Sequence, residues 1–167
     1  MANNNRRTIE YDVEGYDVIT EALMELLNQY PALQTNDAIT FNTLDENSGI
    51  SMFPLSGSII ERKSKDIIGH TTEICQYPFY VIARYGYLNE SRKINMKEWL
   101  DKLGRWLEQQ PIIVGETTYT LSNYPVLSGN RRFLEIRRTT PAALNAINSN
   151  NTEDWAISIV ARYENQY

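Results

Sequence analysis

Cysteine and histidine are almost absent from this chain, which has one of each among its 167 residues. A single Cys excludes an internal disulfide and a Cys-based zinc site, and a single His excludes a His-pair metal motif. We therefore expect no metal and no cofactor. No apolar run approaches the roughly 20 residues that span a bilayer, and no apolar core of a secretory signal follows residues 1–7. The sequence predicts a protein of the cytosol, or one released by lysis, without a membrane partner.

An excess of positive charge is also lacking. The chain has 16 basic and 21 acidic residues, for a net charge of −5. This balance argues against a general binder of nucleic acid or anionic membranes, which would be basic overall. The charge is uneven, because residues 1–50 hold nine acids and two bases whereas the remainder has a slight basic excess. Two interpretations stay open: a solvated acidic helix, or complementary faces that meet between copies of the chain.

Motifs that carry chemistry are missing as well. No GxxxxGK[ST], GxGxxG or GxSxG string occurs. His70 and Cys75 are the one possible Cys–His pair, but five residues apart on an extended chain they face opposite ways, and a thiol nucleophile needs its base within hydrogen-bond reach. We therefore expect no enzyme. A deep apolar pocket lined by converging acids such as Asp66, Glu73 and Glu135 would favour an enzymatic or ligand-binding alternative.

The residues that are present predict a single domain, with an N-terminal mobile arm at about residues 1–8 that carries nothing to bury. Apolar residues recur at intervals of three and four over residues 18–30. This spacing predicts an amphipathic helix over 17–29, with Asp17 as its N-cap and Pro31 as its stop.

A second helix is indicated by the apolar stripe that runs through residues 96–107. Asn95 and Glu98 form the pattern of a capping box at its start, and Pro111 ends it. Trp99 and Trp106 belong to the stripe. We interpret them as core residues rather than as part of a cofactor site.

Alternating apolar residues predict a long strand over 73–86, with one wholly apolar or aromatic face. Pro78 lacks an N–H group, so the strand is expected to be an edge there or to carry a bulge. Within the strand expected at 131–138, Leu134 and Ile136 are expected on one face. A helical turn is expected at 142–147. Further strands are expected at 38–42, 50–55, 58–63, 112–114, 117–121, 131–138 and 154–164.

These elements together predict an α+β fold. The expected architecture is a mixed, mainly antiparallel β-sheet with two amphipathic helices packed on one face.

Two groups of surface residues each allow two interpretations. Arg131, Arg132, Arg137 and Arg138 bracket a strand, where they either solubilise its ends and discourage edge pairing or contact DNA phosphates or an acidic neighbouring subunit. The second interpretation makes all four candidate interface or lumen residues. The abundant tyrosines either form the outer side of a sheet or contribute to a protein interface. The tyrosines concerned are Tyr77, Tyr80, Tyr85 and Tyr87.

One part of the sequence resembles a known family. Residues 76–85 read Gln-Tyr-Pro-Phe-Tyr-Val-Ile-Ala-Arg-Tyr, and residues 100–108 read Leu-Asp-Lys-Leu-Gly-Arg-Trp-Leu-Glu. They resemble the tail-terminator (minor capsid) proteins of long-tailed bacteriophages, in which a strand ending in Arg-Tyr leads into a Leu-Asp-x-Leu-Gly-x-Trp-Leu-Glu helix. The strand at 155–163, which ends in Ala-Arg-Tyr-Glu, is also similar. The resemblance covers about residues 16–30 and 73–164, and residues 32–62 match nothing in the family.

The resemblance implies a structural virion protein with no catalytic residues. Such a protein forms a homohexameric ring in the neck, caps the tail tube, stops its growth and docks onto the head connector after assembly in the host cytoplasm. DNA passes through the ring, so non-specific contact with DNA is implied. The alternatives are another head-completion or tail-completion protein, or a small ligand-binding or enzymatic α+β domain.

Overall fold

The computed structural model describes residues 8–86 and 90–167. The arm expected at about residues 1–8 lies, apart from Thr8, outside the described residues. Along the chain the elements are α1 (Val13–Leu27), β1 (Ile39–Phe41), β2 (Gly49–Pro54), β3 (Ile59–Lys65), β4 (Thr71–Tyr85), α2 (Glu90–Leu107), β5 (Ile112–Val114), β6 (Thr117–Tyr119), β7 (Arg131–Arg138), β8 (Ala143–Ile147) and β9 (Glu153–Gln166).

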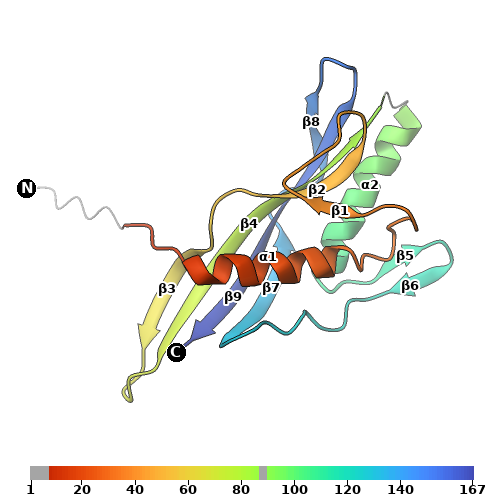
Figure 1. Cartoon of the computed structure of the whole chain (residues 1–167). Helices are drawn as coiled ribbons and strands as arrows, with labels where there is room; N and C mark the ends of the chain where they lie inside the picture. Colours follow the sequence, from red (N-terminus) through yellow and green to blue (C-terminus); the bar gives the residue numbers. More distant parts are fainter. Residues whose placement is uncertain (1–7, 87–89) are drawn as a thin grey trace, which may run out of the picture.

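Two long antiparallel strands, β4 and β9, form the centre of the sheet (Figure 1). At one end β2 and then β1 extend the sheet beside β4, while β8 pairs with β9. At the other end β3 pairs with β4 and β7 pairs with β9. The pair of β1 and β2 is parallel and the other pairs of this sheet are antiparallel. The expected α+β fold with a mixed, mainly antiparallel sheet is therefore confirmed.

Helix α1 begins four residues earlier than the sequence predicted. Its N-cap is Asp12 rather than Asp17, and the Asp12 side chain accepts a hydrogen bond from the N–H of Gly15 at 3.1 Å. The buried apolar repeat starts after this first turn and therefore did not predict it. Contacts of Asp12 with residues of distant strands stabilise the turn. The apolar stripe is confirmed by the burial of Ile19 and Leu23.

Helix α2 begins at Glu90, so Asn95 lies inside the helix and the predicted capping box is wrong. No Gly or Pro interrupts residues 90–95, and Glu, Arg and Lys in this segment are good helix formers. The predicted core stripe is confirmed in its second half by the burial of Leu100, Leu103, Trp106 and Leu107, while Trp99 is partly exposed.

The apolar face expected for β4 is confirmed, because alternate residues from Cys75 to Ala83 are completely buried. Pro78 lies at a gap between two paired strands on one side of β4, since β2 ends with Pro54 opposite Phe79 and β3 begins with Ile59 opposite Gln76. In this gap the N–H of Leu55 donates to the Pro78 carbonyl at 3.0 Å. The strand is interior, but no strand pairs with it on that side at Pro78. The missing N–H therefore breaks no ladder hydrogen bond.

Two predictions for the C-terminal third are wrong. Residues 143–147 form β8 rather than a helical turn, because pairing with β9 overrides the local helix propensity. Leu134 and Ile136 lie on opposite faces, since Leu134 is exposed and Ile136 is buried. A bulge between Phe133 and Glu135 inserts one residue and reverses the alternation along β7.

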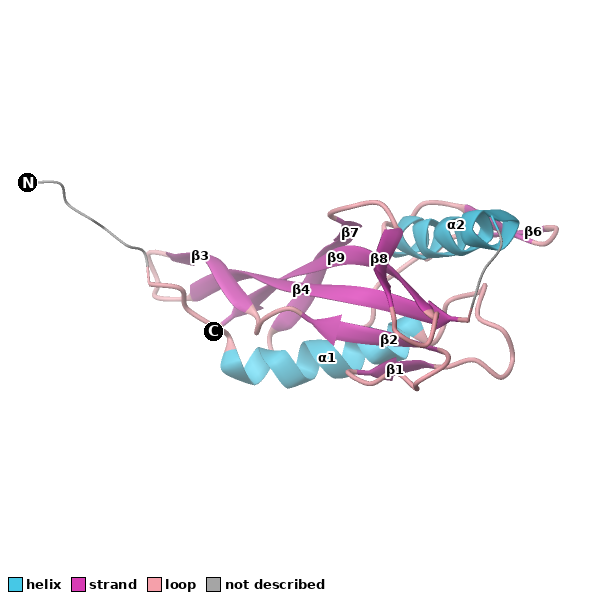
Figure 2. Ribbon diagram, turned by 90° about the horizontal axis from the view of Figure 1, so that it is seen from above, coloured by secondary structure: helices cyan, strands magenta, loops and turns pink. Residues whose placement is uncertain are grey.

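Both helices contribute to one core together with the inner sides of β4 and β9. Tyr30, just after α1, packs against Trp99 and Trp106 of α2 with ring centroids 5.1 and 5.6 Å apart, and its hydroxyl donates to the Trp99 carbonyl at 2.9 Å. In Figures 1 and 2 α1 crosses one side of the sheet, whereas α2 stands at the end near β8. The expected packing of both helices side by side on one face is not confirmed.

We predict that Trp106→Ala lowers the free energy of unfolding by about 3–5 kcal/mol, because the indole is 4% exposed and its removal leaves a cavity. Urea denaturation followed by circular dichroism measures the change. The matched control is Ile94→Ala on the same helix, where a 59% exposed side chain should change stability by less than about 0.5 kcal/mol. An unchanged free energy of unfolding in Trp106→Ala would contradict the assignment of Trp106 to the core.

Candidate functional surfaces

The buried carboxylate of Asp12 joins the start of α1 to two strands of the sheet. Arg131 of β7 donates to both of its oxygens, from Nη2 to Oδ1 at 2.8 Å and from Nε to Oδ2 at 3.0 Å. The hydroxyl of Tyr163 on β9 donates to Oδ2 at 2.7 Å. A Cβ atom at Gly15 would collide with this carboxylate and would lie 2.7 Å from the Tyr163 hydroxyl. The glycine therefore permits the close approach of helix, carboxylate and sheet.

The ion pair between Asp12 and Arg131 is shielded from solvent, with side chains 6% and 12% exposed. Burial raises the pKa of Asp12, but the hydrogen bonds from Arg131 and Tyr163 outweigh burial and hold the pKa below its usual value. The carboxylate is thus ionised at neutral pH. We interpret the pair as a structural clamp that fastens α1 to β7 and β9.

Arg138, at the other end of β7, makes a second clamp with the end of α2. Its Nε donates to Oε1 of Glu108 at 2.9 Å, its Nη2 donates to Oε2 at 3.0 Å, and its backbone N–H also donates to Oε1. Burial raises the pKa of Glu108, but the hydrogen bonds from Arg138 bring the pKa below its usual value. The aliphatic part of Arg138 lies so close to Gly104 that a Cβ atom there would collide with it. Gly104 therefore lets helix and strand come together.

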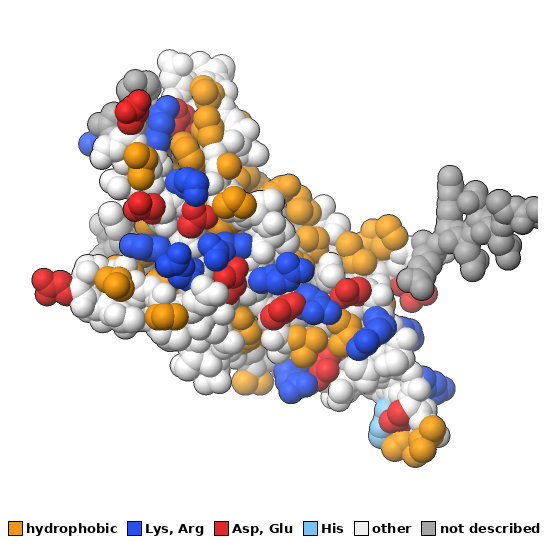
Figure 3. Space-filling model, turned by 180° about the vertical axis from the view of Figure 1, so that it is seen from behind, with side chains coloured by type: hydrophobic (Ala, Val, Ile, Leu, Met, Phe, Trp, Pro, Cys, Tyr) orange, Lys and Arg blue, Asp and Glu red, His pale blue; other side chains and the backbone are white. Residues whose placement is uncertain are grey.

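The face of the sheet opposite α1 presents the other two arginines of β7. The Arg132 side chain is 72% exposed and pairs with Glu164 at 2.6 Å, and the half-exposed Arg137 lies 3.6 Å from Glu135. Figure 3 shows this side, where basic and acidic side chains alternate among hydrophobic ones. The structure thus separates the four candidates. Arg131 and Arg138 bind the helices to the sheet through ion pairs within the chain. Arg132 and Arg137 remain available to a neighbouring subunit or to DNA.

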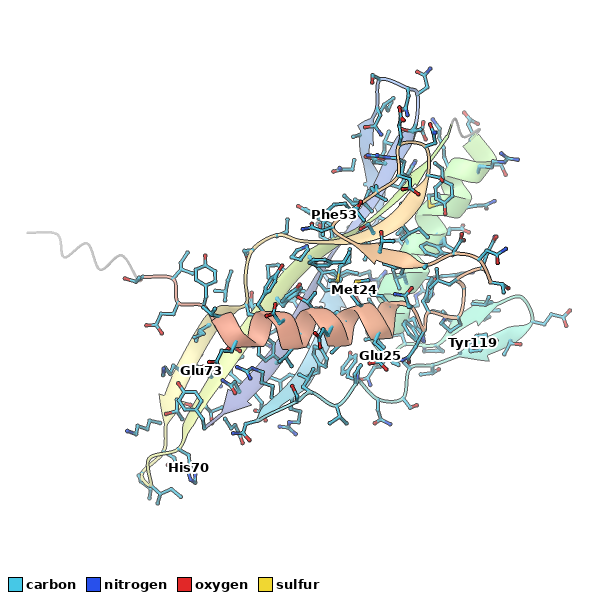
Figure 4. All side chains as sticks on the ribbon, viewed as in Figure 1. Met24, Glu25, Phe53, His70, Glu73 and Tyr119 are labelled. Atoms are coloured by element: carbon cyan, nitrogen blue, oxygen red, sulfur yellow. The ribbon has the colours of Figure 1, made fainter. Side chains whose placement is uncertain are left out.

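The solvent side of α1 is acidic. Its exposed carboxylates recur at intervals of three and four, and none of them takes part in an ion pair among the described residues. They are Glu14, Asp17, Glu21 and Glu25, of which Glu25 is labelled in Figure 4. Both interpretations of the acidic N-terminal region, a solvated helix or a face that meets a basic one, remain open.

The three acids of the enzymatic alternative do not converge. Glu73 lines an open cavity of about 750 Å³ beside the start of α1, Asp66 lies in the turn between β3 and β4, and Glu135 lies on the opposite face of the sheet. Figure 4 shows Glu73 well above the turn that carries His70.

Glu73 is already engaged by its neighbours. Its carboxylate pairs with Lys63 at 3.0 Å and accepts a hydrogen bond from the Tyr167 hydroxyl at 2.7 Å. Burial raises the pKa of Glu73, but these two partners bring the pKa below its usual value. Within residues 8–86 and 90–167, no three His, Cys, Asp or Glu side chains gather in a way that could hold a metal ion.

The Cys–His pair and the tyrosine group are likewise dispersed. Cys75 is completely buried, and burial raises the pKa of its thiol to about 12, whereas His70 lies in an exposed turn beside Asp66. The predicted positions of both residues are confirmed. Tyr77 is in the core, while Tyr80 and Tyr85 are half-buried. Tyr87 lies outside the described residues.

The turn between β3 and β4 presents two isoleucines to solvent. Ile67 is fully exposed and Ile68 is 75% exposed. The side chain of Asp66 accepts hydrogen bonds from the N–H groups of Ile68 at 3.0 Å and His70 at 2.9 Å, so the turn is ordered without burying either isoleucine. Figure 3 shows hydrophobic side chains at this projecting tip, next to the histidine. Sequence reasoning missed this feature, although two adjacent isoleucines between Asp and Gly were a visible signal.

Other exposed apolar side chains lie on elements at the periphery of the core. They belong to the segment that leads into α1, to the hairpin of β5 and β6, and to β8. The residues are Ile9, Tyr11, Val13, Ile113, Tyr119, Leu144 and Ile147. Single exposed apolar residues are ordinary, but clusters on projecting elements mark interaction sites.

Comparison with known proteins supplies no family for this chain, since no family model and no curated protein matches it. Neither of the helices in the described residues is long and apolar enough to cross a bilayer. The clamps and the exposed surfaces are therefore the features of the structure that bear on its function.

We predict that Arg131→Gln lowers the free energy of unfolding by about 3–5 kcal/mol, because it leaves Asp12 ionised and buried without its cation. Arg132→Gln, the next residue on the same strand, is the matched control and should cost less than about 1 kcal/mol, because its pair is exposed. Urea denaturation at pH 7 measures both. Equal losses in the two variants would contradict the clamp.

The same pair predicts a pH dependence. The pKa of Asp12 is lower in the folded chain than in the unfolded chain, so its stabilisation is complete above the unfolded value of about 3.9 and is lost as the pH falls through the folded value. The loss of stability below about pH 4 should be shallower in Arg131→Gln than in Arg132→Gln. Denaturation at a series of pH values measures the slopes, and parallel slopes would contradict the prediction.

Gly104→Ala should destabilise the chain although alanine favours a helix by about 1 kcal/mol over glycine. The reason is that the new Cβ would displace Arg138 from Glu108. In an Arg138→Ala background the same change should cost less, because the contact with Cδ1 of Ile157 at 3.0 Å remains but the collision with Arg138 is gone, and a double-mutant cycle in urea measures the difference. A stabilising effect of Gly104→Ala alone would show that Arg138 does not pack across the helix.

Proposed function

We propose that this chain is a structural virion protein, a tail terminator that caps the tail tube of a phage as a ring and joins it to the head connector. Its partners would be further copies of itself in a homohexamer, the tail tube protein and the head connector protein. Its function would lie in subunit contacts rather than in catalysis.

The segments that carry the resemblance are neighbours in the fold. Residues 76–85 belong to β4, residues 155–163 belong to β9, and residues 100–108 cover the end of α2. β4 and β9 pair along nearly their whole lengths, and Gly104 of α2 approaches Ile157 of β9. The likeness therefore follows one continuous structural unit, which supports the proposal.

The observation that carries the proposal is the placement of exposed apolar side chains on parts that project from the core. The tip at Ile67 and Ile68 is the strongest example, since neither side chain is covered by any of the residues that the structure describes. A subunit of a ring needs different surfaces that fit those of the next copy, and projecting apolar groups serve that purpose. Arg132 and Arg137 are the residues that we place toward a neighbour or toward DNA in the lumen.

A different head-completion or tail-completion protein would have the same kind of surfaces and would differ in its neighbours. The enzymatic or ligand-binding alternative is weakened, because Asp66, Glu73 and Glu135 do not share a pocket. The large cavity beside Glu73 is open, and its two buried acids, Glu73 and Asp12, are paired with Lys63 and Arg131.

The test is assembly with the tail tube protein of the same virus. We expect a mass near six times 19.3 kDa by sizing with light scattering, alone or on addition of tube protein, and rings at tube ends by negative stain. Tubes grown with this protein should be shorter and capped, whereas an unrelated acidic protein of similar size should leave their length unchanged. A chain that stays monomeric and forms no ring under either condition would contradict the function, and binding to the connector alone would favour a completion protein.

A further inference from the structure

The two ends of β4 carry features that complement each other. At its first end the turn of residues 66–70 holds Ile67 and Ile68 in solvent. Branched apolar residues are unfavourable choices for an exposed turn, which normally takes Gly, Asn, Asp, Ser or Pro. Because Asp66 fixes the backbone, the isoleucines are already ordered and little further entropy is lost when they bind.

At the other end of β4, an apolar groove of about 450 Å³ lies between the first half of α2 and the loop after α1. Tyr85, Met96 and Trp99 form its apolar wall. Its polar lining residues are Gln34, Asp37, Arg92 and Asn95. Trp99 is held in place because its Nε1 donates to the carbonyl of Ala32 at 3.0 Å. The groove is thus a preformed apolar surface with no occupant from the described parts of the chain.

Tip and groove are separated by the length of β4. A strand of 15 residues spans about 50 Å, so one copy cannot place its tip in its own groove (Figure 1). A contact between a tip and a groove therefore joins two copies through different surfaces. Repeated contacts of this kind close into a ring or extend into a filament.

Charges at the two ends are also complementary. Lys65 ends β3 directly beside the tip, and Asp37 stands at the margin of the groove. Neither side chain takes part in an ion pair among residues 8–86 and 90–167, so each has a charge to offer a partner. Asp66 at the tip and Arg92 at the groove give each end a charge of the other sign as well, but the carboxylate of Asp66 is already engaged by the N–H groups of the turn and by His70. An approach of Lys65 to Asp37 therefore favours one orientation of the contact.

We propose that Ile67 and Ile68 of one copy occupy the groove formed by Tyr85, Met96 and Trp99 of the next copy, with Lys65 approaching Asp37. This inference rests on the proposed ring and specifies the contact that builds it. The contact area is small, so a single contact is weak and gains strength when the ring closes or when a tube presents many copies.

The test is cross-linking between two differently tagged forms of the full chain. Ile68→Cys on one form and Met96→Cys on the other are treated with a short bismaleimide, and the native Cys75 is completely buried in both. We expect the mixed pair to cross-link at least tenfold faster than the control pair Ile147→Cys with Met96→Cys. Ile147 is a suitable control because its side chain is 65% exposed on a different projecting strand.

A charge reversal checks the orientation without disturbing the core. Lys65→Glu in the tip form should lower the cross-linking rate several-fold, and Asp37→Lys in the groove form should restore it. Three outcomes would overturn the inference. They are equal cross-linking rates for Ile68→Cys and the control Ile147→Cys, cross-links between two tips, and capture of the tip by tube protein or by vesicles of anionic lipid.

The outcome is separate from that of the proposed function. Rings that cap tubes but give no cross-link from tip to groove would overturn this contact and leave the tail terminator standing. A specific cross-link from tip to groove in a protein that neither closes into rings nor caps tubes would support the contact and refute the terminator.

Discussion

The buried carboxylate of Asp12 is the interaction on which the arrangement of the molecule depends. It caps α1, accepts two hydrogen bonds from the guanidinium group of Arg131 on β7 and accepts one from the hydroxyl of Tyr163 on β9. An ionised group inside a protein is tolerated only when all of its acceptor sites are satisfied, so these partners have to meet in one place. The start of the first helix is thereby tied to the two strands at the end of the chain, over a separation of 119 residues.

The second clamp, between Arg138 and Glu108, fastens the end of α2 to the sheet in the same way. Both clamps belong to β7, and the bulge in that strand brings their arginines to the same side. In a regular strand without the bulge, Arg131 and Arg138 are seven residues apart and would lie on opposite faces, so one helix would lose its anchor. A local irregularity of one strand therefore determines which arginines are structural and which, Arg132 and Arg137, face outward.

In the proposed assembly, the surfaces that meet lie at the periphery of this clamped core. The turn of residues 66–70 is held by Asp66, and the groove is held by the hydrogen bond from Trp99 to Ala32. The long central strands keep these two surfaces far apart, so self-association through them has a direction. The residues that resemble the phage family lie mostly in the core between the two ends. In our proposal that core serves as the scaffold, and the projecting surfaces make the contacts.

Periodicity in the sequence was sufficient for the α+β class, for the buried stripe of α1, for the inner face of β4 and for the positions of Cys75 and His70. These features depend on residues close together in the chain, and burial of one face repeats with the period of the element. Only the tertiary structure decided that Asp12 starts α1, that residues 143–147 form a strand, that β7 carries a bulge, and that Arg131 and Arg138 are internal while Arg132 and Arg137 are exposed. Each of these depends on pairing with another element of the fold, and the free energy of such a contact leaves no trace in the local pattern.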